Sequence, residues 1–233
     1  MQKEQINKLV RKNILSLKPY SSARDEFSGT DGVFLDANEN PFGELNRYPD
    51  PHQQELKQKL SAIKNMPVSS IFVGNGSDEV IDLTYRIFCN PGKDKALTFT
   101  PTYGMYEVSA EINDVELIKI PLTTDFQIDF DALENHLGDE TLKLIFICSP
   151  NNPTANNLDN IEAVLQKFNG IVIVDEAYID FSTSGSFLNK IEQYPNLIVM
   201  QTFSKAWGLA AARVGMAYSN ELIISHYNKV KPP

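Results

Sequence analysis

The chain has 233 residues, of which 42% are apolar and 22% charged, the composition of a globular chain large enough to bury its own core. Its 30 acidic and 21 basic residues give a net charge of −9, which argues against bulk binding of nucleic acid. The sequence holds no run of eighteen apolar residues and no signal-peptide pattern, so we expect no membrane contact and a cytoplasmic location. The two cysteines and three histidines are scattered, so we expect free thiols and no metal site.

The predicted elements begin with an amphipathic helix over 1–17, whose apolar side holds Ile6, Leu9, Val10, Ile14 and Leu17. Residues 18–50 carry prolines and glycines with little periodicity, which indicates an arm or surface loop. From residue 56 onward, apolar runs alternate with helical patterns. Helices are expected over 56–63, 77–88, 104–112, 130–137 and 158–168, and strands over 71–73, 96–99, 115–120, 142–148, 171–174, 197–200 and 214–218.

Three of these strands, at 142–148, 171–174 and 197–200, are apolar on both faces and rich in β-branched residues. Such strands are typical of a parallel sheet buried between two layers of helices. The sequence therefore predicts an α/β fold, an α/β/α sandwich with a mainly parallel central sheet.

Polar groups follow these strands, and in open α/β sheets ligands bind beyond the carboxyl ends of the strands. The segments expected at that edge are 74–79, 100–104, 149–154, 175–178 and 201–205. The first of them, G-N-G-S-D-E, places free amides at a helix N-terminus, which favours an anion. It matches neither the dinucleotide-binding glycine fingerprint nor the P-loop pattern, which argues against a Rossmann-type dehydrogenase and an ATP site.

Each of these polar residues has an ordinary explanation when taken alone. A lone lysine such as Lys205 is usually a solvated charge, and an aspartate such as Asp175 often caps the next element. Taken together, they match the needs of one cofactor, pyridoxal 5′-phosphate. This cofactor requires a lysine for a Schiff base, a carboxylate against its pyridinium nitrogen, a phosphate cradle and a stacking aromatic ring.

At these residues the chain resembles the fold type I, aspartate-aminotransferase-like family of pyridoxal-phosphate enzymes, and within it the histidinol-phosphate branch. Eight segments carry the resemblance: L-K-P-Y-S-S-A-R (17–24), L-D-A-N-E-N-P-F-G (35–43), R-Y-P-D (47–50), G-N-G-S-D-E (74–79), P-T-Y-G-M-Y (101–106), S-P-N-N-P-T (149–154), V-D-E-A-Y-I-D-F (174–181) and T-F-S-K-A-W-G-L-A-A-A-R-V-G (202–215). The last three are highly specific to the family, and the first three point to the branch.

The resemblance implies a role for each residue around the cofactor ring. Lys205 would form the Schiff base, and Asp175 would keep the pyridine nitrogen protonated. Tyr178 and Asn152 would hydrogen-bond the ring hydroxyl, and Tyr103 would stack on the ring. Lys205, Asp175 and Tyr178 would then be the catalytic residues.

The resemblance also implies how the phosphate and the substrate are held. The phosphate would contact backbone amides and polar side chains at the strand ends: Gly76, Ser77, Asp78, Thr202, Ser204 and Arg213. Tyr48 would reach the cofactor phosphate of a neighbouring subunit, which implies a homodimer. Tyr20 and Asn38 would contact the substrate.

By resemblance, residues 1–50 form an N-terminal helix and arm, part of a small domain and of the dimer contact, and 51–233 form the large cofactor-binding domain. Family members carry a further C-terminal portion of the small domain, so we expect this chain to be truncated. Ala155 stands where the family usually has glycine, which is harmless unless the backbone there needs a positive φ.

The implied function is an aminotransferase of histidine biosynthesis that exchanges an amino group between histidinol phosphate, or imidazole-acetol phosphate, and glutamate, or 2-oxoglutarate. Two alternatives remain open. One is a related pyridoxal-phosphate enzyme such as a threonine-phosphate decarboxylase, whose cofactor residues would look alike. The other is a truncated, non-catalytic product that binds the cofactor or nothing.

Overall fold

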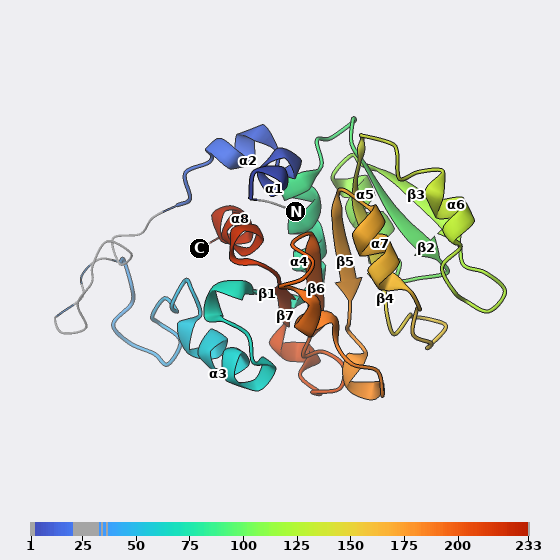
Figure 1. Ribbon diagram of the computed structural model, residues 1–233. Coiled ribbons are helices and arrows are strands. Elements are labelled where there is room, and N and C mark those ends of the chain that lie inside the picture. The colour runs from blue at the N-terminus through green and yellow to red at the C-terminus, as the bar shows by residue number, and fades with distance from the viewer. Residues whose placement is uncertain (1–2, 21–32, 34, 36, 233) are drawn as a thin grey trace.

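The computed structural model describes residues 3–20, 33, 35 and 37–232 (Figure 1). Residues 21–24 of the first quoted segment, Asp36 of the second, and most of the predicted arm between 18 and 36 lie outside the described residues. The predicted division at residue 50 stays a prediction.

One seven-stranded sheet forms the centre of the molecule, with strand order β1-β7-β6-β5-β4-β2-β3. The strands are β1 (Ile71–Asn75), β2 (Lys95–Thr100), β3 (Glu116–Pro121), β4 (Leu142–Cys148), β5 (Ile171–Asp175), β6 (Leu197–Thr202) and β7 (Val214–Tyr218). Only β7 runs antiparallel to its neighbours, β1 and β6. The other pairs are parallel, which confirms the mainly parallel sheet.

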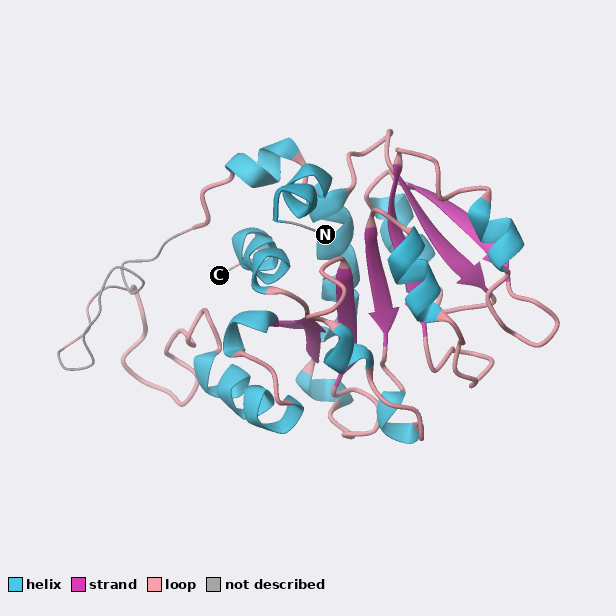
Figure 2. Ribbon diagram, viewed as in Figure 1, coloured by secondary structure: helices cyan, strands magenta, loops and turns pink. Residues whose placement is uncertain are grey.

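Helices cover both faces of the sheet (Figure 2). Because side chains alternate along a strand, Ile171 and Ile173 of β5 enter one core while Val172 and Val174 enter the other. The first core contains α1 (Lys3–Leu9), α2 (Lys12–Ser16), α4 (Gly76–Phe88), α5 (Met105–Ile112) and α8 (Glu221–Val230). The second contains α3 (Gln54–Lys64), α6 (Phe130–Glu134) and α7 (Ile161–Lys167). The predicted α/β/α sandwich is confirmed.

Four short 3₁₀ helices complete the described elements: η1 (Val68–Ser70), η2 (Ile179–Phe181), η3 (Phe187–Lys190) and η4 (Ala210–Ala212). Of these, η2 and η3 lie between β5 and β6, and η4 lies between β6 and β7. In the chain, η2 and η4 come after the polar segments 175–178 and 201–205 that were expected at the edge of the sheet.

The structure corrects several predicted helices. The single helix expected over 1–17 is two, since the Arg11 amide leaves the helical ladder and donates to the Ile87 carbonyl at 2.9 Å. Leu17, expected on the buried side, is 39% exposed. The helices expected over 130–137 and 158–168 are shorter, and α8 was not predicted at all.

The sheet topology places five strand ends at one edge. β1 and β6 are both antiparallel to β7 and therefore run in the same direction. The carboxyl ends of β1, β2, β4, β5 and β6 consequently meet on one side, as the sequence predicted. The loops that follow these strands carry the candidate functional residues.

Candidate active site

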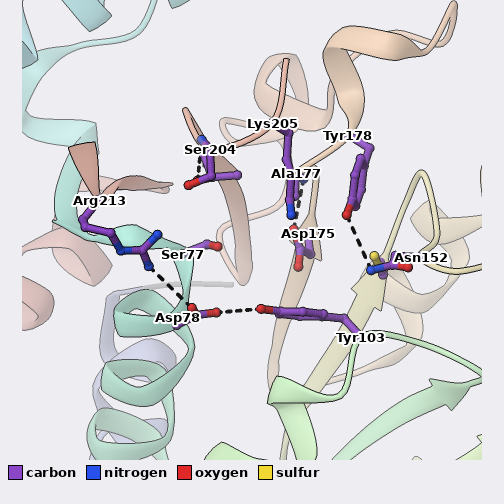
Figure 3. A pocket seen from close by; sticks show the side chains of 12 residues that line it. Ser77, Asp78, Tyr103, Asn152, Asp175, Ala177, Tyr178, Ser204, Lys205 and Arg213 are labelled. Carbon is purple, nitrogen blue, oxygen red and sulfur yellow. Dashed lines mark hydrogen bonds and ion pairs between the residues drawn. The ribbon is translucent and has the colours of Figure 1, made fainter. Parts of the chain in front are cut away.

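A cavity of about 140 Å³ lies at this edge (Figure 3). It gathers ten of the residues predicted from the sequence, which lie at or beyond the carboxyl ends of five strands: Ser77, Asp78, Tyr103, Asn152, Asp175, Tyr178, Thr202, Ser204, Lys205 and Arg213. Cys148 and Ala177 complete its lining. The tertiary structure therefore brings together residues that are more than 130 positions apart in the chain.

The N-terminus of α4 forms one wall of the cavity. Helix geometry leaves the first-turn amides, among them those of Ser77 and Asp78, without an intrahelical acceptor, and the helix dipole favours an anion there. The sequence pattern predicted that this helix begins at residue 77. The structure instead begins α4 at Gly76, with Asn75 as an N-cap that makes no side-chain hydrogen bond.

Gly76 joins β1 to α4 through a backbone with φ of +77°. A Cβ at this position would lie 2.5 Å from the Nη2 atom of Arg213. The Gly76 amide donates to the Arg213 carbonyl at 2.8 Å, so this amide, which the resemblance assigns to the phosphate, already has an acceptor within the protein. The first-turn residues of α4 that line the cavity are Ser77 and Asp78.

Arg213 and Tyr103 both contact the carboxylate of Asp78. The Arg213 Nη2 atom lies 3.7 Å from Asp78 Oδ2, and the Tyr103 hydroxyl donates to Asp78 Oδ1 at 3.0 Å. Burial, followed by the hydrogen bond to Asp78, raises the pKa of the Tyr103 phenol. Tyr103 is therefore a neutral aromatic ring on one side of the cavity, with Arg213 as a cation on the other (Figure 3).

Lys205 is exposed and lies over Tyr178, with its Nζ atom 5.4 Å from the ring centroid. The Asn152 Nδ2 atom lies 3.5 Å from the Tyr178 hydroxyl, at the limit of a hydrogen bond. The turn before Lys205 is held by Thr202, whose Oγ1 accepts from the Ser204 amide at 3.2 Å. An amine, a phenol and an amide therefore lie side by side in the cavity.

Asp175 ends β5 and is only 2% exposed. Its Oδ1 accepts from the Ala177 amide at 3.0 Å, and its Oδ2 accepts from the Tyr106 hydroxyl at 2.6 Å. Burial raises the pKa of this carboxyl to about 6, against the lowering effects of the two hydrogen bonds. A carboxylate so placed would pair readily with a cationic nitrogen in the cavity.

Sequence reasoning missed two residues that hold this region. Tyr106, quoted in the segment 101–106 but given no role, carries the hydroxyl that contacts Asp175. Glu176 follows Asp175 and, because strand side chains alternate, points to the opposite side of the sheet. Its carboxylate accepts from the Ser186 hydroxyl at 2.6 Å, the Phe187 amide at 2.6 Å and the Gln201 amide group at 2.9 Å. It thus fixes the loop that carries Tyr178.

Four predicted residues do not line the cavity: Gly76, described above, and three others. Tyr20, Asn38 and Tyr48 line a separate groove of about 840 Å³, in which Arg213 also takes part. Tyr20 is 72% exposed and Tyr48 is 75% exposed. Their predicted contacts with substrate and with a second subunit stay predictions.

Ala155 adopts φ of +60°, the left-handed conformation that glycine favours. The backbone at this position therefore does have a positive φ, the condition under which alanine in place of the family's glycine is not harmless. The alanine is strained there. Among the described residues, no group of three His, Cys, Asp or Glu side chains is placed to hold a metal ion. Nor does any described helix combine the length and apolarity needed to cross a membrane.

The fold and the cavity define a pyridoxal-phosphate-type α/β transferase of fold type I. The family model for aminotransferase class I and II matches residues 26–233. The chain belongs to this family. Its curated relatives include histidinol-phosphate aminotransferases of Cytophaga hutchinsonii, at 55% identity, and of Bacteroides fragilis, at 56%. Each match covers 98% of this chain and 67% of the relative.

Solved structures of histidinol-phosphate aminotransferases are also similar to this chain. The histidinol-phosphate aminotransferase of Sinorhizobium meliloti in complex with pyridoxal 5′-phosphate matches with a TM-score of 0.72 and 25% identity, covering 79% of this chain and 51% of that one. The enzyme of Clostridium acetobutylicum matches with a TM-score of 0.72 and 26% identity, covering 81% and 56%. The chain thus spans about two thirds of the curated relatives and about half of these solved chains.

Proposed function

We propose that this chain forms the cofactor-binding part of a histidinol-phosphate aminotransferase. In the proposed reaction an amino group passes between histidinol phosphate, or imidazole-acetol phosphate, and glutamate, or 2-oxoglutarate. The observation that carries the proposal is the single cavity that holds Lys205, Asp175 and the N-terminus of α4. Its support is the 55% identity to relatives of that name.

The residues of the cavity fit pyridoxal 5′-phosphate. A Cβ at Gly76 would fill the place of the Arg213 guanidinium, so the turn is shaped to keep that cation beside the α4 amides. These amides and Arg213 suit a phosphate group, and the buried Asp175 suits a protonated ring nitrogen. Tyr103 would lie against the ring, with Tyr178 and Asn152 near its hydroxyl.

When bound, the cofactor supplies an aldehyde that condenses with amines and a ring that accepts an electron pair. The amine of Lys205 would hold the cofactor through its aldehyde and would serve as the base that moves a proton at the substrate Cα. Asp175 would hold the proton on the ring nitrogen. The Tyr178 hydroxyl would orient the cofactor through a hydrogen bond.

Three finer proposals concern partners and location. Tyr48 and the exposed apolar residues Trp207 and Leu209, which are 42% and 46% exposed, support a homodimer in which Tyr48 reaches a second cofactor site. Tyr20 and Asn38 would contact substrate from the groove that shares Arg213 with the cavity. The free thiols of Cys89 and Cys148 support a cytoplasmic location.

Replacement of Lys205 tests the proposal. The purified chain, mixed with pyridoxal 5′-phosphate, is expected to absorb visible light and to yield a lysine adduct at residue 205 after borohydride reduction. Lys205→Ala is expected to yield no such adduct, whereas Lys93→Ala, an exposed lysine away from the cavity, behaves as the original chain.

Two results would count against the proposal. An adduct that persists at the cavity in Lys205→Ala would refute the role of Lys205. An original chain that stays colourless with added cofactor would refute cofactor binding by this chain. A coloured chain whose absorbance does not change with glutamate or histidinol phosphate would favour the related-enzyme or non-catalytic alternatives.

A further inference from the structure

Tyr106 lies directly behind Asp175 and is fully buried in the first core. Its ring stacks on Phe146, with 5.0 Å between centroids and 20° between planes, and meets the edge of Tyr103 at 5.8 Å. With the ring packed in this way, its hydroxyl lies 2.6 Å from Asp175 Oδ2. Packing of the ring in the core thus supports the position of this hydroxyl.

The direction of this hydrogen bond follows from the chemistry of its surroundings. Burial, followed by the charge of Asp175, holds the pKa of the Tyr106 phenol well above its usual value, so the hydroxyl keeps its proton and donates it. Cys148, the other polar neighbour, is a neutral thiol, because burial raises its pKa to about 12. The charged side chains that act on Asp175 are Asp78 and Lys205.

We propose that Tyr106 is a positioning residue that keeps Asp175 ionised and oriented toward the cavity. With the Ala177 amide on Oδ1 and the Tyr106 hydroxyl on Oδ2, each carboxylate oxygen has one donor and a remaining lone pair. Hydrogen bonds that stabilise the ionised form make a carboxylate a weaker base. A proton shared between this carboxylate and a cationic partner therefore stays on the partner. If the proposed function holds, that partner is the ring nitrogen of pyridoxal 5′-phosphate.

A matched pair of variants tests the role of Tyr106. Tyr106→Phe removes the hydroxyl and keeps the ring that packs on Phe146. Tyr85→Phe is the control, and it removes an equally buried hydroxyl from the same core. The Tyr85 hydroxyl donates to the Tyr106 backbone carbonyl at 2.9 Å and not to Asp175. The Asp175 carboxyl is followed by carbon NMR in the cofactor-free protein across a pH titration.

In Tyr106→Phe the pKa of Asp175 is expected to rise by about one unit or more, since a hydrogen bond to a charged group is lost. In Tyr85→Phe it is expected to stay where it is in the original chain. An Asp175 pKa that is equal in Tyr106→Phe and the original chain would overturn the proposal. If Tyr106→Phe does not fold, 3-fluorotyrosine at position 106 retains the hydroxyl as a stronger donor. The Asp175 pKa should then fall, and no change would overturn the proposal.

A second readout connects this role to the cofactor. In chains loaded with pyridoxal 5′-phosphate, the pH profile of the visible absorbance is expected to move in Tyr106→Phe and to stay unchanged in Tyr85→Phe. A profile that does not move in Tyr106→Phe would contradict the effect on the ring nitrogen. Failure of the original chain to take up the cofactor would contradict the proposed function, and the NMR titration would still decide the role of Tyr106.

Discussion

The Gly76 amide donates to the Arg213 carbonyl at 2.8 Å, and the Arg213 guanidinium occupies the space that a side chain at position 76 would need. The two residues are both in positive-φ conformations, at +77° and +53°. Gly215 tightens the same corner, because a Cβ there would lie 2.2 Å from the Ser77 nitrogen. Glycines at 76 and 215 therefore let β7 approach the α4 turn closely enough to place Arg213 beside the helix N-terminus.

Gly76→Ala is expected to weaken binding of pyridoxal 5′-phosphate roughly tenfold or more, because the new methyl group displaces the guanidinium from the phosphate cradle. The left-handed backbone adds a cost of about 1–2 kcal/mol to folding. Cofactor titration by absorbance measures the first effect and urea denaturation the second. Gly138→Ala is the control, since a Cβ there meets nothing within 4 Å. Equal affinities in both variants would contradict this account of the cradle.

Ala155→Gly is expected to stabilise the protein by about 0.5–1 kcal/mol, because it relieves the left-handed strain at an alanine with φ of +60°. Urea denaturation of the cofactor-free chain measures the change. The comparison is Ala163→Gly within α7, where the same substitution should destabilise by about 1 kcal/mol. A loss of stability in both variants would show that Ala155 bears no strain.

The stability of the cofactor-free chain is expected to fall between pH 4 and 7 through Asp175. Burial raises the pKa of this carboxyl from 3.8 to about 6, so the folded state binds its proton more tightly than the unfolded state. The contribution of Asp175 is therefore fully present below pH 4 and is lost as the pH rises through 6. The difference of about two pKa units between the folded and unfolded states corresponds to about 3 kcal/mol in the free energy of unfolding.

Urea denaturation of Asp175→Asn and the original chain at several pH values isolates this effect. The difference in free energy of unfolding between them should change by about 3 kcal/mol from pH 4 to pH 7. Asp139→Asn is the control, because hydrogen bonds from Thr141, and then Lys95, lower the pKa of Asp139 to about 2. Its difference curve should be flat over the same interval. A flat curve for Asp175→Asn would refute the prediction.

Local patterns predicted most of the fold. The strands at 142–148 and 214–218 begin and end where the apolar runs predicted, because runs of apolar and β-branched residues mark a buried strand without help from the rest of the chain. The short helices were less predictable. The break near Arg11 depends on the Ile87 carbonyl, which lies far along the chain.

The sequence by itself determined the fold class and the edge of the sheet at which Lys205, Asp175, Tyr178 and Asn152 gather, since each lies at or beyond the end of a strand whose apolar pattern is clear. Only the tertiary structure decided which groups hold them. Tyr106 reaches Asp175 across 69 positions, and Glu176 binds Ser186 and Gln201 on the opposite face. Such contacts depend on packing between distant segments, and no local pattern records them. The structure also decided that Tyr20, Asn38 and Tyr48 lie in a groove of their own, beside the cavity and not within it.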